Sequence, residues 1–346
     1  QWFYFSRAVK QRYPQCYGVH RAELDQILLD NSRAKGAHVY EETSVTGTDF
    51  SHAEYVCVTT LGKDGESQWH ARFLIDASGR DTFLANRFKC KQPHPKHASA
   101  AIYGHFEGVE RLPGTDAGNI TLFWFDHGWF WLIPLTHGIT SVGMVCWPYF
   151  LKTRKTDLDT FFQDTVASCP PLVRRMQGAR ITRPVTATGN YSYVSEKMHG
   201  DRFLMLGDAY AFIDPIFSSG VLLAMKSAFI GAAAVDAGLR NPAQMARGLQ
   251  RFEKSVHKGL KGFTWLIFRM TTPVIRQLVM HPRNVLGVEN AVIAILAGDV
   301  HDNPRARLGM VLFKFIYYMG CLARLPSSLR AYYQRRHLIR PESSGA

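Results

Sequence analysis

The run from Phe203 to Ala234 limits the fold of this chain more than any other segment does. It reads FLMLGDAYAFIDPIFSSGVLLAMKSAFIGAAA, which predicts a buried strand, a turn, a loop and then a helix rich in small residues. Gly207 lets the backbone approach a ligand closely, and Asp208 offers a carboxylate to sugar hydroxyls just past the strand end. The run therefore predicts mixed α and β structure built around a ligand site.

The start of the predicted helix is a second binding element. Ser219 and Gly220 place backbone N–H groups and the positive end of a helix dipole where an anion or an electron-rich ring edge can bind. An ordinary serine cap would account for Ser218 or Ser219 alone. It would not account for the whole run, so we interpret the run as a binding site.

Composition indicates a globular protein of one large domain with two or three lobes. Of the 346 residues, 46% are hydrophobic and 20% are charged, which excludes a disordered chain and one wholly embedded in a membrane. The net charge of +13 suits nucleic acid, anionic lipid or an acidic protein. The basic residues are spread along the chain without a zinc-finger, homeodomain or RNA-binding motif, so nucleic acid is not an expected partner.

The cysteines indicate a reducing compartment. They stand far apart and form no C-x-x-C pair, so we expect reduced structural thiols and no disulfide framework. The six positions are Cys16, Cys57, Cys90, Cys146, Cys169 and Cys321. The opening residues QWFYFSRAVKQ lack the order of a secretory signal, and a cytoplasmic location is expected.

The remaining segments alternate between strand and helix patterns. Val19 to Gly36 has apolar residues at helical spacing and ends on a capping glycine, which predicts a helix. Strands are expected at 38–50, 54–62 and 67–79, and a second, mostly antiparallel sheet at 99–147. Helices are expected at 157–176, at 219–239 and from Pro242 onward, with breaks at Pro273, Pro282, Pro304 and Pro326.

The stretch from Leu308 to Leu325 is nearly long enough to span a bilayer. Lys314 lies in its middle, and basic residues follow it at Arg324, Arg330, Arg335 and Arg336. We expect a core or interface helix here, with peripheral membrane contact as the alternative.

Three segments together resemble the flavoprotein monooxygenases related to the aromatic hydroxylases. Gly207-Asp208, followed by Asp214-Pro215 and Gly220, resembles the second FAD fingerprint of that family. Asp76-Ala77-Ser78-Gly79-Arg80 resembles its D-x-x-G motif at the flavin pyrophosphate and ribose. The segment from Val19 to Asp25 resembles the helix whose arginine, here Arg21, reaches the FAD phosphates, and a guanidinium suits a diphosphate.

The resemblance implies an α+β or α/β fold with a glutathione-reductase-type FAD-binding domain. That domain would comprise residues 1–90 and 186–240, a substrate-domain sheet would occupy 91–185, and a helical region would occupy 241–346. The implied cofactor is FAD. The cofactor-binding residues that the resemblance implies are Arg21, Val45, Asp76, Gly79, Gly207, Asp208, Asp214, Pro215 and Gly220.

A tryptophan motif narrows the resemblance to the flavin-dependent halogenases. Trp129-Phe130-Trp131-Leu132-Ile133-Pro134 matches their W-x-W-x-I-P signature at every fixed position, although two tryptophans alone would be typical of an aromatic core strand. In that family, reduced FAD from a flavin reductase and oxygen convert a halide to hypohalous acid. The resemblance implies catalytic roles for Trp129, Trp131 and Pro134, which keep the substrate away from the flavin, and a halide at the N–H groups of Ser219 and Gly220.

Phe217 bears on the substrate. Tryptophan halogenases carry glutamate at the matching position, whereas D-P-x-F-S-S-G-V resembles the enzymes that chlorinate or brominate phenols or pyrroles, free or attached to a carrier protein. The segment Glu289 to Val300 also resembles that second group. An electron-rich aromatic substrate from secondary metabolism, such as antibiotic biosynthesis, is therefore expected. A single-component hydroxylase that reduces its own flavin with a nicotinamide cofactor, and a non-catalytic flavin-binding protein, remain open alternatives.

Two features of the family have no counterpart in the chain. No G-x-G-x-x-G turn lies near residue 1, and the catalytic lysine of the family would precede the segment that resembles Gln1 to Lys10. We expect both to lie upstream of Gln1 in a longer protein, and we do not assign the lysine role to Lys10. A natural variant without catalysis is the rival explanation. No metal site is expected, because His94 and His97 lie in the proline-rich loop KQPHPKH, where we expect surface histidines.

Overall fold

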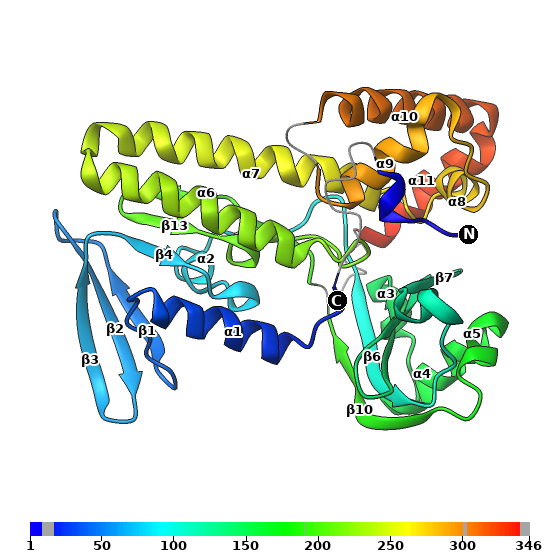
Figure 1. Ribbon diagram of the computed structural model, residues 1–346, viewed down its shortest axis with the longest axis horizontal. Helices are drawn as coiled ribbons and strands as arrows, with labels where there is room; N and C mark the ends of the chain where they lie inside the picture. The colour runs from blue at the N-terminus through cyan, green and yellow to red at the C-terminus, as the bar shows by residue number, and fades with distance from the viewer. Residues whose placement is uncertain (9–16, 190, 300–302, 340–346) are drawn as a thin grey trace, which may run out of the picture.

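The structure is a computed structural model that describes residues 1–8, 17–189, 191–299 and 303–339, with side chains to residue 335. Two long helices, α6 (Gly220–Arg240) and α7 (Met245–Ile267), run side by side along the molecule. One end carries a sheet of β1 (Ser44–Asp49), β2 (Val56–Gly62) and β3 (Gly65–Ala71). The other end carries a five-stranded sheet and the C-terminal helices (Figure 1).

A short parallel strand pair lies at the centre of the part of the molecule that includes α6 and α7, which we call the cofactor half because the sequence predicts a cofactor site there. β13 (Phe203–Met205) is fully buried and pairs in parallel with β4 (Leu74–Asp76), while the two-residue strand β12 (His199–Gly200) pairs on its other side. The carboxyl ends of parallel strands meet at one edge of a sheet. The turn at Gly207 to Ala209, η4, therefore lies beside the turn at Gly79 to Asp81, η2, although the two are far apart in the sequence.

α6 covers this strand pair closely because its inner face consists of small residues. A Cβ on Gly231 would lie 2.8 Å from Leu204 and 2.9 Å from Leu206, so only glycine fits between α6 and β13. Ser227, one turn earlier, is also buried. The small residues that distinguish this helix in the sequence are therefore a packing requirement.

The five-stranded sheet is antiparallel throughout, and four of its strands lie within the predicted range 99–147, whereas its edge strand at 180–188 was not predicted. Its order is β10 (Arg180–Thr188), β6 (Ala100–Glu107), β9 (Ile139–Cys146), β8 (Gly128–Pro134) and β7 (Thr121–Phe125). One face packs its apolar side chains, among them Phe130 and Leu132, against helices α4 (Leu158–Ala167) and α5 (Pro170–Arg175). The alternation of a strand places Trp129 and Trp131 on the opposite face.

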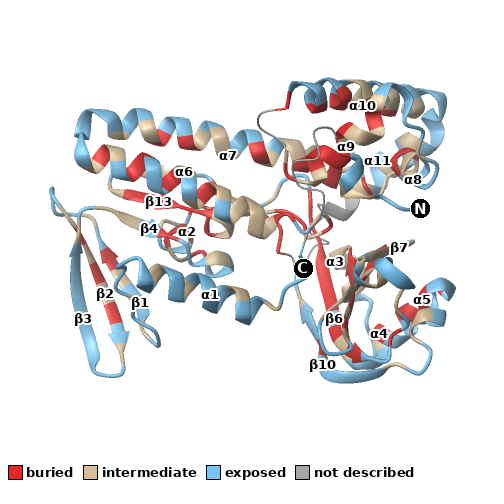
Figure 2. Cartoon of the chain, in the orientation of Figure 1, coloured by how far each residue is buried: buried red, intermediate tan, exposed pale blue. Residues whose placement is uncertain are grey.

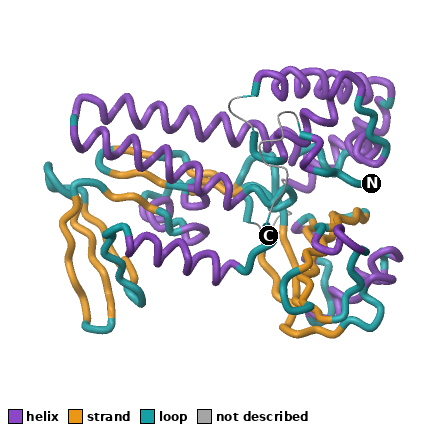
Figure 3. The backbone as a smooth tube through the Cα atoms, in the orientation of Figure 1, coloured by secondary structure: helices purple, strands orange, loops and turns teal. Residues whose placement is uncertain are grey.

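The other elements connect these parts. They are η1 (Phe5–Arg7), α1 (Arg21–Ala34), α2 (Phe83–Arg87), β5 (Lys91–Pro93), α3 (Pro148–Lys152), β11 (Tyr193–Ser195), β14 (Ala211–Phe212), α8 (Pro273–Met280), α9 (Val288–Leu296), α10 (Pro304–Ala323) and α11 (Leu325–Ile339). Strand order in the third small sheet is β14, β11, β5. Figure 3 shows that the C-terminal part is almost entirely helical.

Two predicted elements differ in the structure, and a third forms as predicted but is exposed. The strand predicted at 67–79 is two strands, because β3 ends at Ala71 and β4, in another sheet, begins at Leu74. The helix predicted at 157–176 is interrupted before Pro170, which has no N–H to continue the hydrogen bonding. α1 forms as predicted but buries no residue, and Ile27 is 65% exposed.

The prolines expected to break the C-terminal helices mark their starts. Pro273 and Pro304 are the first residues of α8 and α10, and Pro326 is the second residue of α11. Proline is favoured at these positions because the first N–H groups of a helix have no partner within it. By length and composition alone, α6 and α10 could each cross a membrane, a test that core helices also pass.

Candidate functional site

Asp208 stands where three distant segments meet. Its side chain is half-buried and accepts no hydrogen bond from the residues that the structure describes, while its backbone oxygen accepts one of 2.7 Å from the Tyr193 hydroxyl. Burial raises the pKa of the Asp208 carboxyl, and the positive charges of Arg80 and Arg21 partly offset this effect. The carboxylate is therefore positioned to accept hydrogen bonds from a ligand, between two cations.

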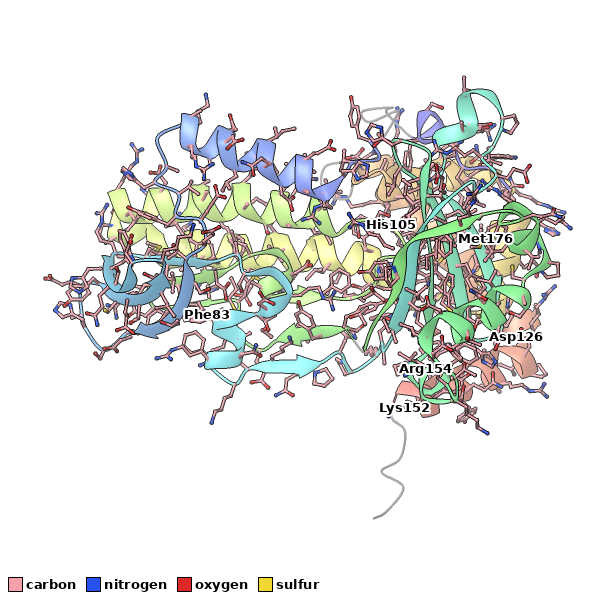
Figure 4. The ribbon with its side chains drawn as sticks, turned by 90° about the horizontal axis from the view of Figure 1, so that it is seen from below. Phe83, His105, Asp126, Lys152, Arg154 and Met176 are labelled. Carbon is pink, nitrogen blue, oxygen red and sulfur yellow. The ribbon has the colours of Figure 1, made fainter. Side chains whose placement is uncertain are left out.

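The two arginines that act on Asp208 come from distant segments of the chain. Arg21 is exposed at the first position of α1, where it pairs with Asp25 at 3.0 Å, and Arg80 donates a 2.8 Å hydrogen bond to the Thr188 hydroxyl. Figures 1 and 4 both show α1 running along the same side of the molecule as α6. Both guanidinium groups are exposed enough to bind a phosphate as well.

Asp76 has a structural role in the neighbouring turn. Its carboxylate is buried and accepts 2.8 Å hydrogen bonds from the backbone N–H groups of Ser78 and Leu84. These bonds hold the turn that carries Gly79 and Arg80. Gly79 has φ +63° and open space at its Cβ position, which a close ligand could occupy. The predicted cofactor contact of Asp76 itself remains a prediction.

Gly207 is confined by both its conformation and its neighbours. Its φ is +51°, and a Cβ there would lie 2.9 Å from the Cβ of Ala224 on α6. Its N–H donates a 3.0 Å hydrogen bond to the Ser227 hydroxyl, which itself donates to the Ala224 carbonyl. Ser227 was not among the predicted site residues, and its only sequence signal is its place among the small residues of the helix.

The predicted anion site lies at the first turn of α6. Ser218 has φ +49°, an unfavourable left-handed conformation for a residue with a side chain. This bend brings Ser219, which is buried, to the helix N-cap and leaves the first N–H groups of the 21-residue helix without intrahelical partners. Ser219 and Gly220 line a small cavity of about 60 Å³ together with Asp208 and Lys226. The rest of its lining is mainly apolar and includes residues of α6 and α7.

A wider open cleft lies on the side of Arg80. It has a volume of about 600 Å³ and is lined by Arg80, Lys91, Tyr191 and Tyr193, among others. The Lys91 ammonium lies 4.2 Å from the centre of the Tyr193 ring and donates to the Thr82 hydroxyl. Burial and the charge of Arg80 lower the pKa of Lys91. Cations beside aromatic rings suit a flat, phosphate-bearing ligand in a cleft of this size.

Both carboxylate oxygens of Asp214 have hydrogen-bond partners within the protein. One carboxylate oxygen accepts the N–H of Ile216, and the other lies 2.8 Å from His97 Nε2 and accepts a 3.1 Å hydrogen bond from the Ser99 hydroxyl. Only 9% of the His97 side chain and 4% of the Asp214 side chain are exposed. The expectation that His97 is a surface histidine is therefore wrong, because it pairs with a carboxylate far along the chain. The predicted cofactor roles of Asp214 and of half-buried Pro215 remain predictions.

Arg335 of α11 contacts His97 on the ring edge that carries Nδ1, whereas Nε2 faces Asp214. Its guanidinium donates to the Lys96 carbonyl and lies 3.4 Å from His97 Nδ1. It stacks over the rings of Phe268 and Trp147, at 5.2 and 5.9 Å from their centres. Burial, together with the charge of Arg269, lowers the pKa of Arg335 to about 10. The C-terminal helix is thus tied to the loop that carries Lys96 and His97, and through His97 to Asp214.

The tryptophan strand packs against the same loop. Trp129 is buried in one apolar cluster with Ile213 and Ile216, and Phe217 packs against this cluster. The ring of Trp131 lies 5.8 Å from that of Trp129, and its N–H donates to the Ser141 hydroxyl. A Cβ on Gly143 would lie 2.3 Å from the Trp131 ring, so the glycine allows the ring to lie across β9.

Other predicted positions lie apart from this junction. Pro134 ends β8, where its carbonyl faces Gly18, and Val45 lies on β1 in the separate three-stranded sheet. Lys10 lies outside the described residues. Within the described part of the chain, no group of three histidine, cysteine or acidic side chains could hold a metal ion. Figure 4 shows His105 of β6 at the junction between the cofactor half and the sheet.

Comparison with known proteins points to one family. Residues 6–271 match the model of the tryptophan halogenase family. The chain is 29% identical over 299 residues to the 1H-pyrrole-2-carbonyl-[peptidyl-carrier protein] chlorinase of Pseudomonas fluorescens, covering 84% of this chain and 65% of the relative. It is 30% identical over 254 residues to the tryptophan 2-halogenase of Chondromyces crocatus, covering 71% of this chain and 48% of the relative.

A solved structure agrees with these relatives. The myxobacterial chondrochloren halogenase, described as a variant of the FAD-dependent halogenases, superposes with a TM-score of 0.70 at 31% identity, over 74% of this chain and 61% of that one. The chain thus spans about half to two thirds of the length of these three proteins.

Proposed function

The chain belongs to the tryptophan halogenase family, and from this membership we propose that it is the larger part of an FAD-dependent halogenase acting on an electron-rich aromatic substrate. The mixed α and β fold and the implied cofactor FAD agree with its relatives. The observation that carries the proposal is the meeting of two features at one loop. Residues 207–220 carry the half-buried Asp208 carboxylate, on which two arginines act, and the loop packs against Trp129 through Ile216 before α6 begins.

FAD fits the residues present on the cofactor side. Asp208 would bind ribose or ribityl hydroxyls, and Arg21 and Arg80 would bind the diphosphate. Gly207 and Gly79, both with positive φ, would allow the cofactor to approach the backbone. When bound in its reduced form, FAD supplies the electrons with which oxygen is activated. A separate flavin reductase would provide that reduced form.

The protein groups around the loop would hold the halide and separate the substrate. The N–H groups of Ser219 and Gly220 would bind chloride or bromide at the positive end of the α6 dipole. Trp129 and Trp131 would form the wall between the flavin and the organic substrate, with Pro134 ending that strand. The wall excludes the aromatic ring from the flavin, which favours halogenation over direct hydroxylation.

The substrate would be a phenol or pyrrole, free or attached to a carrier protein, within secondary metabolism in the cytoplasm. Two observations support this class. Phe217 packs beside Trp129, and an apolar ring there lines the loop without adding charge. One relative is named as the chlorinase of a pyrrole held by a peptidyl carrier protein. The surplus of positive charge would also favour an acidic carrier.

The test is an assay of the full-length protein with FAD, a flavin reductase and its nicotinamide, and a panel of phenols and pyrroles, free and carrier-bound. We expect a product whose mass increases by one halogen in place of hydrogen, only when chloride or bromide is present. A hydroxylated product that forms without halide would exclude the halogenase, and its formation when the flavin reductase is omitted would assign the single-component hydroxylase. Flavin binding with no product from any substrate in either salt would favour a non-catalytic protein.

A further inference from the structure

Six large apolar side chains form a stripe along the outer face of α10. They are Leu308, Val311, Phe315, Tyr318, Met319 and Leu322, and we name this set the α10 stripe. Each is between 48% and 72% exposed. Their spacing of three or four residues places them on one side of the helix. Figure 2 shows α10 at an outer edge of the molecule.

The opposite face of α10 is tightly packed, which fixes the orientation of the stripe. Ala306, Gly309, Met310, Phe313 and Tyr317 are buried, and a Cβ on Gly309 would lie 2.3 Å from the Ala291 Cβ of α9. A helix held against α9 in this way cannot be surrounded by lipid. It can rest on a bilayer surface with its free face in the interface.

The charge of this region has one sign. Residues 303–339 contain seven arginine and lysine residues and no aspartate or glutamate. At 100° per residue, Arg305 borders the α10 stripe on one side, and Arg307 and Lys314 border it on the other. Arg324 and Arg330 are exposed just beyond its end. An apolar stripe with basic borders is complementary to a surface that is apolar inside and negatively charged outside.

A second copy of the chain is a poor occupant of this stripe. Two α10 helices packed face to face would bring Arg305, Arg307 and Arg324 of each copy near those of the other, with no acidic residue on either helix to compensate. We propose that the α10 stripe is a peripheral membrane-binding surface, which seats the protein on a bilayer that carries anionic lipids. α11 adds four more exposed apolar or aromatic residues, at Leu325, Leu329, Tyr332 and Tyr333.

Vesicle flotation tests the proposal with the full chain. We use phosphatidylcholine vesicles with and without 30 mol% phosphatidylglycerol (about a third of the lipid, an anionic surface). We expect binding to the anionic vesicles that is weakened about tenfold or more without phosphatidylglycerol, and that falls with rising salt. Val311→Asp combined with Phe315→Asp should abolish flotation, and Arg305→Gln with Arg307→Gln should reduce it several-fold.

Matched controls separate the surface from general effects. Leu61→Asp removes an equally exposed apolar residue from β2, and Arg174→Gln with Arg247→Gln removes two exposed charges elsewhere. Both should float as the parent does, and circular dichroism with a melting curve confirms that every variant folds. Flotation unchanged in the stripe variant would overturn the proposal. So would absence of flotation together with a dimer, or an acidic protein partner, that the stripe variant no longer forms.

Discussion

The backbone N–H of Gly207 donates its hydrogen bond to the hydroxyl of Ser227, which lies two turns inside α6. The bond joins the turn that carries Asp208 to the helix that begins at Ser219 and Gly220. The candidate cofactor and halide positions are therefore fixed to a single rigid element.

Replacing Gly207 should weaken the packing between its turn and α6. Gly207→Ala would force a Cβ to 2.9 Å from Ala224 in a left-handed backbone conformation, at a cost of about 2–4 kcal/mol in the free energy of unfolding. FAD affinity should fall with it. Gly36→Ala is the matched control, because Gly36 also has positive φ but open space around it. Denaturant titration of both variants measures the difference, and equal losses would show that contact with Ala224 is unimportant.

Asp208→Asn should separate stability from binding. Burial disfavours the charged carboxyl, so the neutral amide should raise the melting temperature of the ligand-free protein. The same change should weaken FAD binding, since the acceptor of ribose hydroxyls loses its charge, and Asp208→Ala should weaken it further. A thermal melt measures the stability of the ligand-free protein, and calorimetric titration of the full-length protein measures the FAD affinity of both variants. Undiminished flavin affinity in both variants would show that Asp208 does not contact the cofactor.

Trp131→Phe should impair halogenation with little loss of stability. Trp131 is partly exposed, and phenylalanine at this position cannot donate the hydrogen bond to the Ser141 hydroxyl, a loss of about 1 kcal/mol. We expect slower formation of halogenated product and more release of hydrogen peroxide, because the wall is less complete. Trp69→Phe on β3 is the control, since that tryptophan is 40% exposed and remote. Normal halogenation in the Trp131 variant would remove the wall role.

His97→Ala should destabilise the protein. The change removes the nearest hydrogen-bond partner of the buried Asp214 carboxylate and leaves that oxygen with the Ser99 hydroxyl, and loss of such a buried hydrogen bond costs about 1–3 kcal/mol. His97→Gln keeps a hydrogen-bond donor and should lose less. Urea unfolding compares the two variants, and equal stability of His97→Ala and the parent would show that the pair contributes little.

His94 should make the fold sensitive to acid. Burial, with the nearby charges of His97, Lys96 and Arg335, lowers the pKa of His94 to about 4 from its ordinary 6.5. Between these values the unfolded chain binds a proton that the folded chain does not, so stability falls as the pH drops from 6.5 toward 4. His94→Gln should flatten this part of the pH profile of the melting temperature. A variant profile as steep as that of the parent would assign the sensitivity to other groups.

Sequence reasoning reached those features that depend on local pattern. Alternation and glycine turns located the antiparallel sheet, and the fixed spacing in the 203–220 run located the turn at Gly207 and the helix start at Gly220. It missed relations that depend on tertiary contact. Nothing near His97 in the sequence indicates that Asp214 is its hydrogen-bond partner. Nothing near Arg335 indicates that its guanidinium contacts His97.

The sequence also did not indicate that the apolar faces of α1 and α10 are exposed. The apolar positions of α1 and α10 have the spacing of core helices, and Ile27 and Phe315 would ordinarily be expected to face inward. Burial depends on which other segments are present to cover a helix, and the hydrophobic pattern does not contain this information.

The parallel pairing of β4 with β13 has a consequence for the order of events during synthesis. The first strand leaves the ribosome long before the second, and an entire antiparallel sheet is made in between. Closing so long a loop is slow, and the pair is not covered until α6 has also emerged. A nascent chain should therefore be unable to retain flavin until residues near 240 are free, and this interval is when a chaperone would be most needed.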